Sequence, residues 1–146
     1  CKYSWYQGIL YFVGNNPNRT EIKQWLIFLE TESKLREKYL KVYFIYGNEI
    51  AYNKNNREKE LEKIGKDLKL EKVALTFVPS FSDTESDINL NKITQTVDNT
   101  FILYKRSRII GKFINLKPNN DNFNMVRQQF DQSINEYFDF PKPKKD

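Results

Sequence analysis

Residues 9–19 read ILYFVGNNPNR, a short apolar run that ends in a turn sequence and leads into the start of a helix. The five apolar residues suit a buried strand, and Gly14 and Pro17 suit the turn that ends it. Asn18, with Glu21 three residues later, has the spacing of a capping box, in which each side chain bonds a backbone N–H of the first helical turn. The pattern therefore predicts a strand that runs directly into a helix.

The remaining chain continues this alternation of strands and helices. Apolar residues at helical spacing extend from Ile22 to Leu29, and the apolar run at 40–46 predicts a second strand. Further predicted elements are a helix within 57–69, strands at 73–78, 100–104 and 109–114, and a last helix from about residue 119 that carries Phe123, Val126 and Phe130 on one face. This order requires a parallel pair at the front and an antiparallel hairpin at the end, which is an α/β fold.

This plan resembles that of a thioredoxin-like domain. In thioredoxin-like oxidoreductases of bacterial envelopes, the first strand runs into a Cys-x-Pro-Cys motif that opens a long helix, and the matching residues 15–18 here read NNPN. The family also has a cis-proline before the first hairpin strand, and the matching position is Asp98 or Asn99. Over residues 9–138 the resemblance implies a central mixed sheet with helices on both faces, a closing β-hairpin and a C-terminal helix.

The redox chemistry of that family is missing from these motifs. Thiol–disulfide exchange needs an attacking thiolate and a resolving thiol, and Asn15 and Asn18 supply neither. The sequence has one cysteine, Cys1, and no histidine, which excludes an intramolecular disulfide, a Cys/His metal cluster and Ser-His-Asp or Cys-His triads. We therefore expect no catalytic residue, no bound metal and no cofactor.

Ligand binding without catalysis remains a hypothesis for the loop between the first strand and the first helix. The N-terminus of a helix binds anions through its exposed N–H groups, and Arg19 would assist there. The candidate ligand-binding residues are Asn15, Asn16, Asn18, Arg19, Asp98 and Asn99. The alternative is that the asparagines only form the turn and cap the helix, since Asn is a leading residue at both positions.

Cys1 is the basis of a second hypothesis, that the protein is a lipoprotein. A chain that opens on its only cysteine resembles the mature bacterial lipoproteins, in which that cysteine bears the lipid. We expect residues 1–8 to form an N-terminal arm that ends in the lipid anchor, 9–138 the thioredoxin-like domain, and 139–146 a flexible basic tail. The location would then be the periplasm or the cell envelope, with anchoring through Cys1. If Cys1 marks only a boundary, the location would be cytoplasmic.

The function expected from these observations is non-catalytic binding of a protein or peptide partner in the cell envelope. One alternative is an oxidoreductase whose partner supplies the second thiol. Another is a basic module that binds nucleic acid through residues 105–108, KRSR, but a net charge of +5 is modest for that role and we expect no nucleic acid partner. The acidic set Glu58, Glu60 and Glu62 lies on a helix face that alternates with lysines, where Glu58 and Glu62 together with Lys59 and Lys63 are interpreted as solvated charge.

Overall fold

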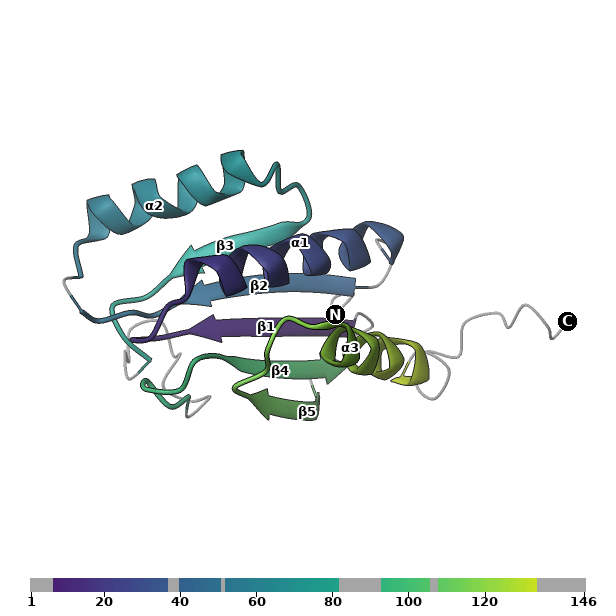
Figure 1. The fold of residues 1–146 in the computed structure, drawn as a ribbon. Helices are drawn as coiled ribbons and strands as arrows, with labels where there is room; N and C mark the ends of the chain where they lie inside the picture. Colours follow the sequence, from purple (N-terminus) through teal and green to yellow (C-terminus); the bar gives the residue numbers. More distant parts are fainter. Residues whose placement is uncertain (1–6, 37–39, 51, 82–92, 106–107, 134–146) are drawn as a thin grey trace, which may run out of the picture.

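The computed structural model describes residues 7–36, 40–50, 52–81, 93–105 and 108–133. Within these ranges a mixed sheet carries three α-helices (Figure 1). The strands are β1 (Gln7–Val13), β2 (Leu40–Tyr46), β3 (Val73–Phe77), β4 (Thr100–Lys105) and β5 (Arg108–Ile114), and the helices are α1 (Arg19–Leu35), α2 (Lys54–Asp67) and α3 (Asn120–Ser133). Cys1, the arm up to residue 6, residues 134–138 and the tail 139–146 lie outside the described residues.

The sheet has the order β3-β2-β1-β4-β5, so β1 lies at its centre. β1 pairs in parallel with β2 and antiparallel with β4, while β3 extends the parallel side and β5 the antiparallel side. The predicted parallel pair, the closing hairpin and the α/β fold class are therefore confirmed. β1 begins at Gln7, two residues before the predicted start, where Gln7 is buried and pairs with both Leu40 and Lys105.

The main core lies between the sheet and the helices. One continuous cluster of buried side chains joins residues of α1, α2 and α3 to alternate residues of the strands. At its centre the fully buried ring of Trp25 lies 4.5 Å from that of Phe101 and 5.0 Å from that of Phe123, measured between ring centroids. The indole N–H of Trp25 donates to the Leu116 carbonyl oxygen at 3.2 Å, so this aromatic core also satisfies its polar atom.

The opposite face of the sheet is covered differently. Its core joins Phe12, Ile45 and Ile102 of the sheet to Val78, Phe81 and Ile93 from the chain between β3 and β4. The sequence interpretation gave helices to both faces, but within the described ranges all three helices lie on one face (Figure 1). The reason is topological: the crossovers from β1 to β2 and from β2 to β3 advance in the same direction, so right-handed connections place α1 and α2 on the same side.

The helix starts follow the predicted capping chemistry in part. The Asn18 side chain accepts a hydrogen bond from the Glu21 backbone N–H at 3.1 Å, which confirms the cap of α1. The Glu21 carboxylate does not complete a capping box but accepts from the Lys117 ammonium at 3.2 Å. α2 begins at Lys54, three residues before the predicted start, because Asn53 caps it through the Asn56 N–H.

A buried carboxylate fixes the entry into β3. Glu30 of α1 accepts hydrogen bonds from the backbone N–H groups of Glu71 (2.8 Å), Lys72 (3.0 Å) and Val73 (3.1 Å). Burial acts to raise the pKa of Glu30, but these three hydrogen bonds together with the Lys34 ammonium outweigh it and lower the pKa below its usual value. The ionised carboxylate therefore holds the turn between α2 and β3 against α1.

We expect Glu30→Gln to lower the free energy of unfolding by about 1–3 kcal/mol at pH 7, because an amide accepts these bonds less strongly and adds donors without acceptors. Since the pKa is lowered in the folded state, the carboxylate stabilises the fold above the unfolded pKa of about 4.3. That contribution is lost as the pH falls through the folded value. Urea unfolding between pH 7 and pH 2 measures the difference.

The control is Glu71→Gln, because the Glu71 side chain is 70% exposed and makes only a 3.6 Å ion pair with Lys34. It should change the stability little at any pH. Equal effects of the two substitutions, or a Glu30→Gln effect that does not depend on pH, would contradict the role given to Glu30.

Candidate functional site

The loop between β1 and α1 meets two other segments at the carboxyl end of β1. These are the start of the β2–α2 connection at residues 47–50 and the chain at 93–99 that precedes β4. Gly14 allows the close approach, because a Cβ atom there would lie 2.5 Å from the Gln95 carbonyl oxygen. The Asn15 backbone N–H donates to that same oxygen at 2.9 Å.

The side chain of Asn15 joins all three segments. Its amide nitrogen donates to the Glu49 carboxylate at 2.9 Å, and its oxygen accepts from the Glu49 N–H at 3.1 Å and from the Gln95 amide at 2.9 Å. Gln95 extends the network, since its amide also donates to the Gly47 carbonyl and its oxygen accepts from the Phe81 N–H at 2.9 Å. Asn15 is therefore a structural joint, whose side-chain oxygen accepts two hydrogen bonds and whose amide nitrogen donates one.

The two neighbouring asparagines of the NNPN sequence are also occupied. The exposed Asn16 donates its amide to the Thr96 carbonyl oxygen, and Asn18 caps α1. This agrees with the alternative in which the asparagines form the turn and cap the helix. Contact of Asn15, Asn16 and Asn18 with a ligand stays a prediction.

The turn before β4 lies next to the start of α1. The Lys117 ammonium bridges the Glu21 carboxylate at 3.2 Å and the Asp98 carboxylate at 3.6 Å. Its hydrogen bond with Glu21 raises the pKa of Lys117. Asn99 directly precedes β4, and its buried side chain pairs with the backbone N–H and carbonyl of Leu116 at 3.0 and 2.8 Å. Asn99 thus extends the β4–β5 pairing by imitating a backbone group.

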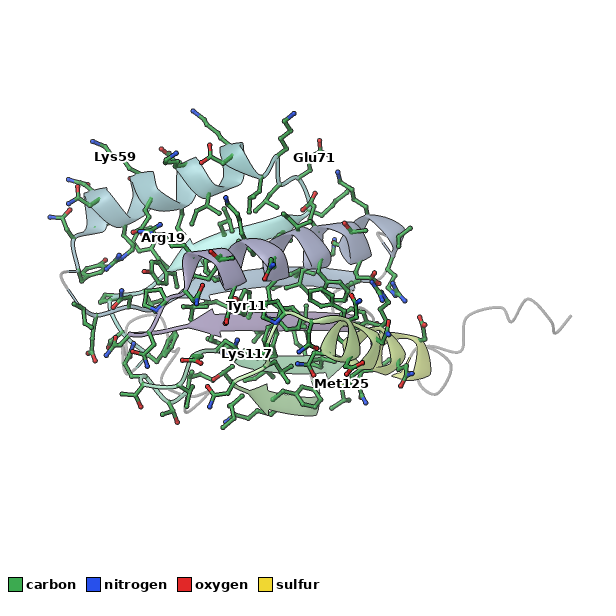
Figure 2. All side chains as sticks on the ribbon, viewed as in Figure 1. Tyr11, Arg19, Lys59, Glu71, Lys117 and Met125 are labelled. Atoms are coloured by element: carbon green, nitrogen blue, oxygen red, sulfur yellow. The ribbon has the colours of Figure 1, made fainter. Side chains whose placement is uncertain are left out.

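Arg19 lies on the other side of the helix start, toward α2 (Figure 2). Its side chain is 75% exposed, and its guanidinium donates to the Glu60 carboxylate at 2.8 Å. Glu60, whose side chain is 20% exposed, also accepts from Arg57 at 2.9 Å and is therefore paired with two arginines. The spacing of Arg57 and Glu60, three residues apart on a helix, is the sequence signal for that pair.

Arg57 itself is a buried cation that sequence reasoning missed. Its guanidinium donates to the carbonyl oxygens of Asn48 (3.0 Å) and Ile50 (3.3 Å) and lies over the rings of Tyr46 and Tyr52. These contacts fix the connection between β2 and α2. Through Glu60, they also hold α2 to the start of α1.

A cavity of about 230 Å³ opens beside Arg19, between α1 and α2. Pro17 and Arg19 line it, whereas Asn15, Asn16, Asn18, Asp98 and Asn99 do not. Of the six candidate residues, only Arg19 therefore lies at this hollow. No group of three or more His, Cys, Asp or Glu residues suited to a metal ion occurs in the described part of the chain. Its helices also include none long and apolar enough to cross a membrane.

Solved structures share this arrangement of strands and helices. A candidate thiol:disulfide interchange protein DsbE from Chlorobium tepidum superposes with a TM-score of 0.66 at 12% identity, covering 91% of this chain and 83% of that one. The thioredoxin domain of a thiol-disulfide oxidoreductase from Bacteroides vulgatus gives 0.56 at 15% identity, covering 88% and 81%. Yeast Sco1 gives 0.57 at 13% identity, covering 90% and 83%.

The chain has the thioredoxin-like fold. Identities this low establish the architecture and carry no activity with them. No protein-family model matches the sequence, and no curated protein matches it either. Within the thioredoxin-like fold, Asn15 and Asn18 stand where the sequence resemblance puts the two cysteines.

We expect Asn18→Ala to lower the free energy of unfolding by about 1 kcal/mol, because the first turn of α1 loses the acceptor for the Glu21 N–H. Asn18→Asp should keep most of the stability, since a carboxylate caps the same N–H and favours the positive end of the helix. Thermal and urea unfolding measure both. Full stability of the alanine variant would show that the cap does not matter for the fold.

Proposed function

We propose that this thioredoxin-like domain acts by binding and does not exchange thiols and disulfides. The observation that supports the proposal most directly is the state of Asn15 and Asn18. Both side chains stand at the family's cysteine positions, and both are engaged in bonds that hold the loop and the helix. An amide side chain supplies neither the attacking thiolate nor the resolving thiol of an exchange reaction.

The position of the binding surface follows from which side of the α1 start has exposed side chains and a cavity. On the side of residues 93–99, Asn15, Asn16 and Asn99 are hydrogen-bonded to neighbouring segments. On the side of α2, the mostly exposed Arg19 borders the cavity. We therefore place the acidic ligand predicted from the sequence on the α2 side. A protein or peptide partner and a location in the bacterial envelope belong to the same proposal and rest on the sequence resemblance alone.

The nucleic-acid alternative has less support. Lys105, the first residue of the KRSR cluster, is 2% exposed and lies at the end of β4, where it pairs with Gln7 in the sheet. A buried lysine does not contact a phosphate backbone, so this cluster offers fewer surface cations than the sequence suggested. Residues 106 and 107 lie outside the described ranges.

The test is an insulin-reduction assay in the presence of dithiothreitol, compared with a buffer control. We expect no turnover above the control, because the sequence holds one cysteine and exchange needs two thiols. Turnover that Cys1→Ser removes would contradict the proposal and favour an oxidoreductase that uses a partner's thiol.

A gain-of-function variant makes a negative result informative. The double variant Asn15→Cys with Asn18→Cys puts a thiol at the start of α1, where the helix dipole lowers the thiol pKa, and a second thiol three residues before it. We expect it to gain measurable turnover, with lower stability because the Asn15 bonds and the Asn18 cap are lost. The single variants are the controls and should stay inactive. A folded double variant without turnover would show that this loop does not have the geometry of an exchange site.

A further inference from the structure

The cavity between α1 and α2 has an apolar floor. Its base is formed by Phe44 and Tyr46 of β2, with Ile22 from α1 and Ile64 and Leu68 from α2 at its sides. All five of these side chains belong to, or pack against, the main core. A cavity with such a lining attracts the hydrocarbon part of a ligand, because filling it removes apolar surface from water.

The rim of the cavity is charged and unevenly paired. It carries the cations Arg19, Lys23 and Lys63 and the carboxylates of Glu60 and Asp67. Asp67 is bonded to Lys63 at 2.9 Å, and Glu60 is bonded to Arg19 and, outside the cavity lining, to Arg57. Lys23 makes no ion pair or hydrogen bond with any other described residue. The carboxylates are thus neutralised by the protein itself, while one rim cation is left for a ligand.

Arg19 and Lys23 lie four residues apart on one face of α1, so both cations reach the same side of the mouth. An anionic group placed there would contact Lys23, which has no partner among the described residues, and the Arg19 guanidinium, whose side chain is 75% exposed. A cationic group would instead meet carboxylates that already have partners. Charge complementarity therefore favours a ligand with one negative head group.

The volume limits the length of the apolar part. A water molecule takes about 30 Å³ in the liquid, and a methylene group is of similar size. The cavity of about 230 Å³ therefore has room for a chain of roughly eight carbon atoms.

We propose that this cavity binds an aliphatic carboxylate of about eight carbons. The chain lies over Phe44 and Ile64, and the head group lies at Arg19 and Lys23. The inference rests on the proposed function, which makes the domain a binding module, and it names the chemical class of the ligand.

Isothermal titration calorimetry of the full chain with butanoate, hexanoate, octanoate and dodecanoate tests the apolar part. The dissociation constant should fall about fourfold for each added methylene up to about eight carbons and then level off. Octanol and octylammonium test the head group. Octanoate should bind about three- to fivefold more tightly than octanol at low salt, and octylammonium should bind more weakly than either. The advantage of octanoate over octanol should shrink at 1 M salt.

Two variants locate the site. Lys23→Glu should remove the preference for octanoate over octanol, while the matched charge change Lys59→Glu should not, because exposed Lys59 projects from α2 away from α1 and does not line the cavity (Figure 2). Ile64→Trp should fill the cavity and weaken octanoate at least tenfold. Thermal unfolding confirms that each variant is folded, and Ile64→Phe serves if the tryptophan variant is not.

Failure of octanoate to bind at millimolar concentration, or an equal affinity for octanol that Lys23→Glu leaves unchanged, would overturn this inference. Tight octanoate binding that survives Ile64→Trp or Ile64→Phe in a folded protein would also overturn it, because the ligand would then lie elsewhere. None of these results concerns thiol exchange. The proposed function fails separately, through turnover in the insulin-reduction assay.

Discussion

The side-chain amide of Asn15 is the interaction on which the whole candidate site depends. It uses both of its atoms to join the end of β1 to Glu49 and Gln95, residues that are 34 and 80 positions away in the sequence. A partly buried amide whose partner is removed leaves its other polar contacts unsatisfied, at a cost of about 1–3 kcal/mol. The network therefore fixes the end of β1 against Glu49 and Gln95, three residues before the Asn18 cap of α1, and Arg19 next to that cap pairs with Glu60 of α2.

The topology of the sheet determines on which side of the Asn15 network the cavity lies. Because β1, β2 and β3 follow one another across the sheet, right-handed crossovers place α1 and α2 side by side on one face. The two helices meet through an ion pair at Arg19 and Glu60 and leave an apolar hollow above β2. The chain before β4 runs on the other face and packs there through Phe81 and Ile93. The site of the family's redox motif and the cavity are thus neighbours on opposite sides of one helix start.

Local sequence was sufficient to predict the elements that local physics determines. Apolar periodicity located the strands, and the Asn18 cap located the start of α1, because these features depend on residues a few positions apart. The prediction of helices on both faces of the sheet was wrong for the described residues. A resemblance in the order of strands and helices does not show which face of the sheet each connecting helix covers.

The polar contacts of the site were beyond sequence reasoning for a related reason. The partners of Glu30 are more than 40 residues away, and Asn99 finds Leu116 only after the hairpin forms. Glu30 was one of several carboxylates with nothing in its neighbourhood to mark it as buried. Gln95 likewise carries no local sequence signal, although its amide donates to the Asn15 side-chain oxygen. Such contacts are created by tertiary folding, and no regular spacing of residues in the sequence predicts them.

The most direct measurement of this account is a double-mutant cycle on Asn15 and Gln95, with Asn15→Ala, Gln95→Ala and the double variant unfolded in urea. If Asn15 is a structural joint that acts with Gln95, the two changes should be coupled by about 1 kcal/mol, within the usual range of about 0.5–3 kcal/mol for residues in one network. Asn15→Ala combined with Asn53→Ala, which removes the cap of α2, should be additive. Additive effects of Asn15 and Gln95, to within about 0.3 kcal/mol, would contradict the central role of this network.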